Sequence, residues 1–259
     1  MLIVVSPAKK LDWSERKHAL TEPPFPGDSA ELIRVMREKS VSEISKLMDL
    51  SENLSKLNHD RYRDYREDPT PDVLRPAMFA FAGDTYQGLD AQSLDAEEVA
   101  FAQDHLRILS GLYGVLRPLD GMQPYRLEMG TRLKTDRGSN LYQFWGDKIA
   151  GALKAQAETL GTDTLLNCAS QEYFGAVDRK ALGLKIVTPV FLDVKNGAEK
   201  VISFNAKRAR GAMARFAITR RITDPAGLAD FDLGGYHFQP GRSSVTELVF
   251  LRNAEAVAA

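Results

Sequence analysis

The chain has 259 residues, a formal net charge of −1, a hydrophobic fraction of 44% and a charged fraction of 27%. This near-neutral balance excludes a global attraction to nucleic acid, so any such function must use a local patch. Cys168 is the only cysteine, which excludes an intrachain disulfide and fits a reducing compartment. No apolar run reaches the roughly 18 residues of a membrane span. We therefore expect a cytoplasmic protein without membrane association.

The first half of the chain predicts short strands and helices. Residues 2–5 form a short apolar run typical of a buried strand, and Pro7 ends it. A helix is predicted from Asp28 or Ser29 to about Lys39, because both residues are good N-caps. Further predicted elements are helices over 42–50, 51–65 and 95–104, and strands over 77–82 and 106–109.

The second half predicts more strands. Residues 111–138 show little regular pattern, and a stretch this long is more often functional than filler. The other predicted elements are a helix over 140–160 before Gly161, strands over 164–168, 184–192, 200–204, 236–238 and 247–251, and a hairpin turn at Asn196–Gly197. This order predicts a mixed α/β (α+β) fold, with residues 1–259 forming one domain around a central, mostly buried sheet.

Residues 205–221 are the most informative segment, because their charge is segregated. They contain six basic residues and no acidic one. Helical spacing places Lys207, Arg208, Arg210, Arg215 and Arg221 on one side, and apolar residues such as Met213 and Phe216 on the other. The segment predicts a helix with a cationic face for an anionic partner. The alternative is an ordinary solvated face, although such faces usually mix both signs of charge.

Two loops that follow predicted strands carry reactive residue types. Lys9 lies in the first and could hold an anion as a point charge. The second contains Asn167, Ser170, Glu172 and Tyr173, which could hydrogen-bond a base or sugar, with Glu172 as acid or base. The alternative is that Ser170 caps a short helix with Glu172 in its first turn.

The segment 111–137 combines arginines with tyrosines, a combination that suits stacking and phosphate contacts. Its alternative is an irregular structural loop held by salt bridges to Asp120, Glu128 and Asp136. Elsewhere, common phosphate-binding and metalloprotease signatures are absent, and the four histidines are scattered. We expect no bound metal and no cofactor.

Several long runs resemble one known family. They include Ser6–Lys9, the run LRILSGLYGVLRPLD at 106–120, MQPYRLEMG at 122–130, and residues 141–146, 189–193 and 206–211. These runs span essentially the whole chain, and they resemble the peroxide stress protein YaaA family.

The resemblance implies a cytosolic bacterial protein that protects DNA and protein during hydrogen peroxide stress by keeping unincorporated iron low. It also implies a single-domain fold with a positively charged cleft, a helix-hairpin-helix-like element and DNA binding. Residues 42–57, which are predicted to form two helices joined by a short turn, are the candidate for this element. Residues 50–53 lack the Gly-hydrophobic-Gly turn that usually presents backbone N–H groups to phosphate.

The leading hypothesis is a monomeric protein that binds double-stranded DNA without strong sequence preference. The residues expected to contact DNA are Lys9, Lys10, Arg117, Arg126, Lys207, Arg208, Arg210 and Arg215. The rival is an enzyme acting on a nucleotide or nucleobase, with Lys9, Asn167, Glu172 and Tyr173 as catalytic candidates and Arg210 as a second phosphate ligand. A third idea is a non-catalytic partner in iron handling. Under the first two hypotheses, we expect Lys9, Asn167, Glu172 and Lys207 to converge on one cleft.

Overall fold

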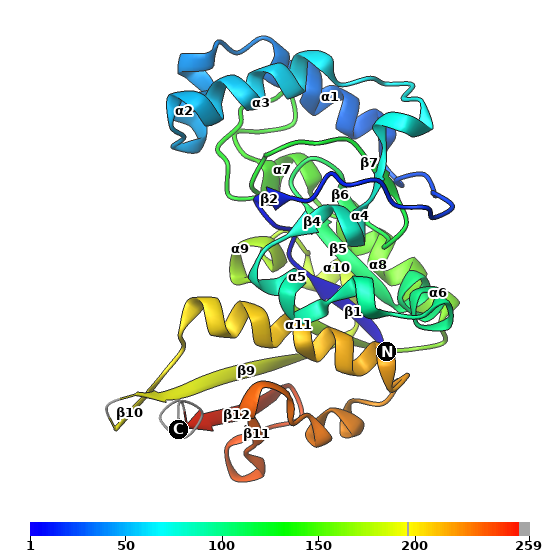
Figure 1. Ribbon diagram of the computed structural model, residues 1–259, viewed down its shortest axis with the longest axis vertical. Helices are drawn as coiled ribbons and strands as arrows, with labels where there is room; N and C mark the ends of the chain where they lie inside the picture. Colours follow the sequence, from blue (N-terminus) through cyan, green and yellow to red (C-terminus); the bar gives the residue numbers. More distant parts are fainter. Residues whose placement is uncertain (196, 254–259) are drawn as a thin grey trace.

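The computed structural model describes residues 1–195 and 197–253, and its centre is an 8-stranded mixed sheet (Figure 1). The strands of this sheet are β1 (Leu2–Val5), β5 (Leu106–Ser110), β6 (Gly114–Leu116), β8 (Thr164–Cys168), β9 (Lys185–Lys195), β10 (Ala198–Lys200), β11 (His237–Phe238) and β12 (Glu247–Asn253). They are arranged in the order β11-β12-β9-β8-β1-β5-β6, and β10 pairs with β9. The prediction of a mixed α/β fold around a central sheet is confirmed.

The middle of the sheet is parallel. Strands β12, β9, β8, β1 and β5 each run parallel to their neighbour, whereas β6 and β11 are antiparallel at the edges. Every residue of β1, β5 and β8 is buried. Parallel strands of this kind are covered on both faces, which explains why they appear in the sequence as continuous apolar runs.

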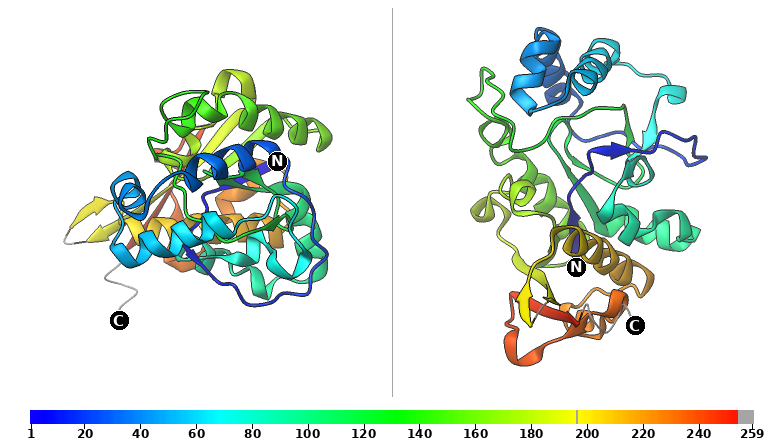
Figure 2. Two further views of the ribbon diagram at one scale, coloured as in Figure 1. Left: turned by 90° about the horizontal axis from the view of Figure 1, so that it is seen from above. Right: turned by 60° about the vertical axis from the view of Figure 1, so that its left-hand side comes forward.

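The helices cover the sheet and add a separate layer at one end. They are α1 (Pro26–Arg37), α2 (Val41–Met48), α3 (Glu52–Asp64), α4 (Ala77–Ala80), α5 (Asp84–Leu89), α6 (Ala96–His105), α7 (Leu141–Trp145), α8 (Lys148–Thr159), α9 (Gln171–Phe174), α10 (Arg179–Leu182) and α11 (Ser203–Thr219). Short 3-10 turns occupy 71–73, 91–93, 225–230, 233–235 and 240–242. Helix α11 packs on β1, β8 and β9, whereas α8 packs on β1 and β6. Helices α1–α3 form the far end of the molecule (Figures 1 and 2).

Two small antiparallel sheets stabilise the segments that connect the strands of the central sheet. One pairs β2 (Lys10–Leu11) with β4 (Phe81–Ala82), and the other pairs β3 (Arg75–Pro76) with β7 (Gly121–Met122). The first of these sheets holds the segment after β1 close to the start of α5. Lys9 and Lys10 are therefore positioned by backbone pairing.

Helices α5 and α11 cross at glycines. A Cβ atom built on Gly88 would lie 1.9 Å from the carbonyl oxygen of Arg208. A Cβ atom built on Gly211 would lie 1.7 Å from the carbonyl oxygen of Thr85. Both distances are far below a van der Waals contact, so only glycine permits this backbone approach.

Three predicted elements are wrong. Residues 77–80 form a helix, and only 81–82 are a strand; a short apolar run cannot distinguish a buried helix from a strand. The helix expected over 140–160 is broken at Gly146, whose φ of 51° ends α7 before α8 begins. The strand expected over 200–204 ends at Lys200, because α11 starts at Ser203. The turn residue 196 lies outside the described residues.

Helices α2 and α3 form a helical hairpin, as predicted from residues 42–65. Ser40 caps α2 with a capping box that includes Glu43, and the turn passes through Asp49 in the left-handed region. The turn contains no glycine, so a helix-hairpin-helix function stays a prediction. Among the described residues, no helix has both the length and the apolar character that crossing a membrane requires.

Candidate functional site

The carboxyl ends of β1 and β8 meet at the point where the sheet changes direction. From β1 the chain continues to β5 on one side, and from β8 it continues to β9 on the other. Open α/β sheets place their ligand sites at such a point. Ser6 follows β1 and Ser170 follows β8, and the Ser170 backbone N–H donates to Ser6 Oγ at 2.9 Å. Ser170 Oγ also accepts from the Tyr173 backbone N–H at 3.4 Å, so Ser170 caps α9.

The segment 128–130 lies beside this point and connects two predicted site residues. Glu172 Oε1 accepts the backbone N–H of Gly130 at 3.0 Å. Lys9 Nζ lies 3.5 Å from Glu128 Oε1, and Arg126 Nε donates to the same oxygen at 2.9 Å. Lys9 and Glu172 therefore lie at the two ends of one short segment.

Tyr173 occupies a different environment from Glu172. It is buried, and burial raises the pKa of its hydroxyl well above the ordinary value. A buried ring cannot stack on a base from solution, whereas Glu172 is exposed. The four catalytic candidates do not share a closed pocket in this structure.

Asn167 and Arg210 share a cleft of about 630 Å³ at the carboxyl end of β8. Asn167 is the penultimate residue of β8, and its Oδ1 accepts the backbone N–H of Ala169 at 3.1 Å. Arg210 reaches the cleft from α11 and makes no hydrogen bond or ion pair with the described residues. Lys207, although on the same helix, is exposed and does not line the cleft.

The basic residues of α11 do not form one continuous face. Arg210 faces the cleft over β8, whereas Arg208 and Arg215 line a hollow on the other side of the helix. Gly211 lies between these two groups, where α5 crosses. The apolar face with Met213 and Phe216 is buried as predicted. The sequence feature that could have indicated this division is Gly211, a glycine in the middle of the basic face, because it allows α5 to approach.

The hollow that contains Arg208 adjoins a second hollow over α5. The first, of about 430 Å³, is lined by Gln87, Asp90, Arg208 and Arg215. The second, of about 190 Å³, is lined by Lys10, Gln87 and Asp90. Because they share Gln87 and Asp90, the two hollows are neighbours, and we call them together the depression over α5. Asp12 lines the second hollow as well, so carboxylates lie among the cations. Arg215 NH1 donates to the Asp90 carbonyl oxygen at 2.9 Å, whereas Lys10 and Arg208 have no partner among the described residues.

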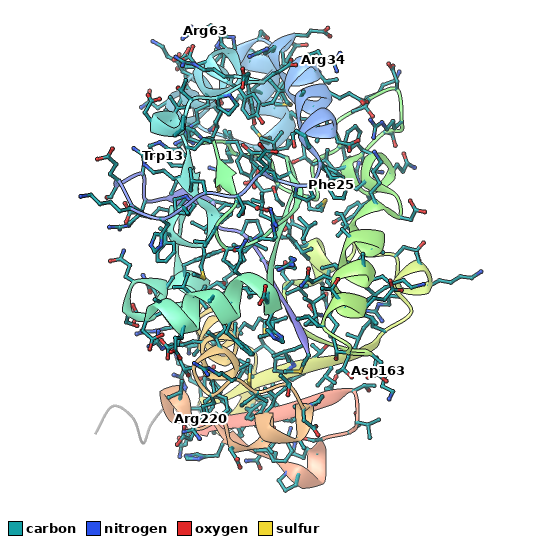
Figure 3. All side chains as sticks on the ribbon, turned by 90° about the vertical axis from the view of Figure 1, so that its right-hand side faces the viewer. Trp13, Phe25, Arg34, Arg63, Asp163 and Arg220 are labelled. Atoms are coloured by element: carbon teal, nitrogen blue, oxygen red, sulfur yellow. The ribbon has the colours of Figure 1, made fainter. Side chains whose placement is uncertain are left out.

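The remaining predicted DNA contacts are engaged in ion pairs. Arg117 NH2 lies 2.9 Å from Oδ1 of the fully buried Asp120, and Arg126 pairs with Glu128. The alternative interpretation is thus right for Asp120 and Glu128 but wrong for Asp136, because Arg137 pairs with Asp28 and Glu31 instead. Arg117 also follows β6, which is antiparallel to β5, so it lies toward the amino ends of the parallel strands, whereas Ser6 lies at their carboxyl ends. The positive charge is dispersed beyond these residues: Figure 3 shows Arg34 and Arg63 at the α1–α3 end and Arg220 near the opposite end.

Comparison with known proteins agrees with the resemblance in sequence. The family described as Peroxide stress protein YaaA matches residues 1–242. The chain belongs to the peroxide stress protein YaaA family. It is 59% identical over 252 residues to a UPF0246 protein of Ruegeria pomeroyi, covering 97% of this chain and 98% of the relative. A UPF0246 protein of Aliivibrio fischeri is 52% identical over 257 residues, with 98% and 99% covered.

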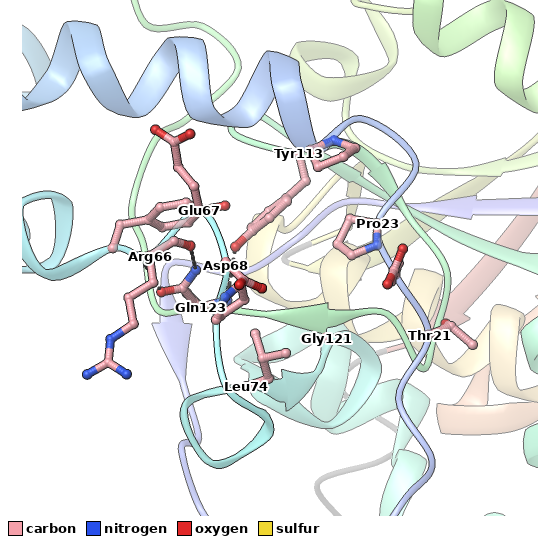
Figure 4. Close-up of a pocket in the computed structure, with 13 residues that line it drawn as sticks. Thr21, Pro23, Arg66, Glu67, Asp68, Leu74, Tyr113, Gly121 and Gln123 are labelled. Carbon is pink, nitrogen blue, oxygen red and sulfur yellow. Dashed lines mark hydrogen bonds between the residues drawn. The ribbon is translucent and has the colours of Figure 1, made fainter.

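This YaaA-family chain has a further pocket that the sequence did not indicate. It has a volume of about 270 Å³ and lies between the connector at 21–26, the loop at 65–69 and β7 (Figure 4). Its charged lining residues are Glu22, Arg66, Glu67 and Asp68, so its net charge is acidic. None of the predicted site residues lines it. An acidic pocket does not suit an anionic ligand.

Gln87 lines the depression, and Arg179 and Glu247 line the cleft, although no sequence pattern in this YaaA-family chain pointed to them. Arg179 and Glu247 are brought to the cleft by α10 and by the pairing of β12 with β9. A single arginine or glutamate belongs to no periodic sequence pattern, so its place in a site cannot be predicted from the sequence. Among the described residues, no group of three or more His, Cys, Asp or Glu side chains could hold a metal ion.

Cys168, the lone cysteine of this YaaA-family chain, should resist peroxide and thiol reagents in the folded state. Burial raises the pKa of its thiol to about 12, although the nearby Arg210 guanidinium acts in the opposite direction. The reactive thiolate is therefore scarce at pH 8. We expect no labelling by Ellman's reagent in native protein and one thiol per chain in guanidinium. Fast stoichiometric labelling of native protein would contradict this expectation.

Proposed function

We propose that this protein acts in the hydrogen peroxide response by binding double-stranded DNA through phosphate contacts, without strong sequence preference. The main support is the depression over α5, where Lys10 lines one hollow and Arg208 the other, each without a partner among the described residues. Lys207 is adjacent to Arg208 on α11, exposed and also without a partner among the described residues. Unpaired, exposed cations have no salt bridge to break when they meet a phosphate.

Existing ion pairs and hydrogen bonds leave fewer of the basic residues free to contact DNA phosphates. Arg117 and Arg126 are held by Asp120 and Glu128, so using them would require breaking an existing ion pair. Breaking a largely buried pair is costly. Arg215 is already bonded to the α5 terminus. We therefore assign the main phosphate contacts to Lys10, Lys207 and Arg208, and an auxiliary contact to Lys9.

The test is a double variant, Lys207→Gln with Arg208→Gln, measured by fluorescence anisotropy on duplexes of different sequence. Phosphate contacts carry no direct base information, so affinity should fall equally for every sequence. The slope of log K against log salt should become shallower by about 2, because each neutralised phosphate contributes roughly 0.9. The matched control is Lys154→Gln with Lys180→Gln, which removes the same charge from exposed positions on α8 and α10.

An unchanged slope in the folded Lys207/Arg208 variant would move the DNA contacts elsewhere. An equal loss of duplex affinity in the control variant would mean that binding depends on the net charge of the protein and not on the positions of Lys207 and Arg208. Circular dichroism of both variants checks the fold. The buried apolar face of α11 is untouched by these changes, so the fold should be retained.

We also propose that the protein keeps unincorporated iron low during peroxide stress, which the resemblance implies; the family's description supports the peroxide stress part of this role. In a bacterium lacking the protein, chelator-accessible iron measured by electron paramagnetic resonance should rise after peroxide treatment. Wild type should restore a low level, and the Lys207/Arg208 variant should not. If that variant fully restored the low iron level, the control of iron would not depend on DNA binding through these residues.

An enzyme acting on a nucleotide or nucleobase is the second candidate. The observation that favours it is the cleft shared by Asn167 and Arg210, an amide and an unpaired guanidinium. Against it, Glu172 is exposed and bonded to Gly130 rather than placed in that cleft. The cleft therefore has residues suited to binding, whereas the expected acid or base lies outside it.

A further inference from the structure

We propose that the cleft at the carboxyl end of β8 binds a small organic phosphate of mononucleotide size, separately from the DNA surface over α5. The geometry that carries the proposal is the meeting of Asn167 from β8, Arg210 from α11 and Glu247 from β12 around one cavity of about 630 Å³. A cavity of this size is typical of small-molecule sites. This inference does not depend on whether the protein binds DNA.

Arg210 supplies the reason to expect an oxyanion. Its guanidinium is half-buried, and burial lowers its pKa, yet it has no carboxylate or carbonyl partner among the described residues. A partly desolvated guanidinium is stabilised by a phosphate, which it can bind in a bidentate manner. Cys168 is the neighbouring sulfur, and its raised pKa keeps it neutral, so it does not compensate the charge.

Two further polar groups are free to orient such a ligand. Oδ1 of Asn167 is occupied by the Ala169 backbone N–H, whereas its Nδ2 has no partner in the described part of the chain. The Glu247 carboxylate is exposed at the cleft and makes no ion pair there. An amide donor near the guanidinium suits a phosphate or base edge. A carboxylate in the same lining suits sugar hydroxyls or an exocyclic amine.

The walls of the cleft are largely apolar and include Phe174, Pro189, Val190 and Phe191. The two phenylalanine rings are buried, so they pack behind the surface of the cleft and do not offer a stacking face. Arg179 lies over the Phe174 ring at 5.7 Å from its centroid, which adds a second cation at the rim. Aromatic and apolar side chains with a few convergent polar groups are the usual composition of a site for a small organic ligand.

The cleft and the DNA surface use different residues of α11. Arg210 and Ala206 line the cleft, whereas Arg208 and Arg215 line the depression over α5. The α5 crossing at Gly211 separates the two sides of the helix. One variant of each side can therefore be tested against both kinds of ligand.

The experiment titrates full-length wild type with AMP, GMP, CMP and UMP by thermal shift and calorimetry. Adenosine and inorganic phosphate serve as the two partial probes. At least one mononucleotide should saturate the protein and raise its Tm, because a ligand that binds only the folded state stabilises it. Adenosine alone and phosphate alone should each bind more weakly than the mononucleotide, since each makes only part of the contacts.

Two variants test the site itself. Arg210→Met should weaken mononucleotide binding on the order of 10- to 100-fold, as expected for losing charge-assisted hydrogen bonds. Val190→Trp should block the cleft while leaving Arg210 in place, so a folding defect in one variant leaves the other informative. Lys207→Gln with Arg208→Gln should leave mononucleotide binding unchanged.

Three outcomes would overturn the proposal. The first is no saturable binding of any mononucleotide to wild type. The second is inorganic phosphate binding as tightly as the mononucleotides, which would leave no role for the apolar walls. The third is Arg210→Met weakening duplex binding while leaving mononucleotide binding unchanged, which would make Arg210 part of the DNA surface.

Discussion

Replacing Gly211 by alanine should destabilise the protein by on the order of 3 kcal/mol, the upper part of the range for overpacking. The new Cβ would lie 1.7 Å from the Thr85 carbonyl oxygen, so α5 and α11 must move apart. The obstacle is backbone rather than a flexible side chain, and separation also disturbs the packing of α11 on the sheet. For a chain of this size, the expected loss in Tm is roughly 10 °C, measured by scanning calorimetry.

Gly151→Ala is the matched control for this prediction. Gly151 lies inside α8, and a Cβ atom built on it has no heavy atom within 4 Å. Alanine favours helix over glycine by roughly 0.8–1.0 kcal/mol, so this variant should be slightly more stable than wild type. Gly88→Ala should destabilise the protein about as much as Gly211→Ala. The variant that carries both changes should lose less stability than the sum of the two single losses, because either change alone already separates the helices. Similar Tm values for Gly211→Ala and Gly151→Ala would contradict the crossing.

Asp193→Ala should cost about 3–5 kcal/mol, because it leaves a buried ionic partner without compensation. Asp193 is fully buried on β9, and its Oδ1 accepts Arg252 Nε at 2.7 Å. Its Oδ2 accepts the Tyr236 hydroxyl at 3.1 Å, and the Arg252 guanidinium lies 4.7 Å from the Tyr236 ring centroid. These contacts join β9, β12 and the turn before β11. Urea denaturation measures the change in the free energy of unfolding.

The exposed pair of Asp163 with Lys185, at 2.8 Å, provides the comparison. Asp163→Ala should change stability far less than Asp193→Ala, because an exposed ion pair is weak. The double variant Asp193→Leu with Arg252→Met should recover part of the loss, since it removes both charges. Equal destabilisation by Asp193→Ala and Asp163→Ala would show that the buried network does not contribute as described.

Much of the sheet was predictable because its central strands are short, apolar and buried on both faces. The strands predicted at residues 2–5 and 164–168 have the same bounds as β1 and β8. The same apolar character misled the prediction at 77–82, where four of the buried residues form a helical turn instead. Local sequence could not resolve this, because no polar residue marks a period in so short a run.

The candidate site was harder to predict, because its geometry depends on contacts between distant segments. Helical spacing placed the basic residues of α11 on one side, but Gly211 lets α5 cross in the middle of that side. The position of Lys9 near Glu128, and the bond between Glu172 and Gly130, follow from tertiary packing at the ends of β1 and β8. Asn167 and Arg210 were both identified, but their shared cleft appears only once α11 is docked on the sheet.

The most direct test of the central claim is a salt titration of duplex binding by wild-type protein, with two unrelated sequences. If Lys10, Lys207 and Arg208 neutralise three phosphates, log K should fall with log salt with a slope near −2.7, at roughly 0.9 per phosphate. Both duplexes should give the same slope and affinity, since phosphates carry no direct base information. No binding at low salt, or a large preference for one sequence with a shallow slope, would contradict the account.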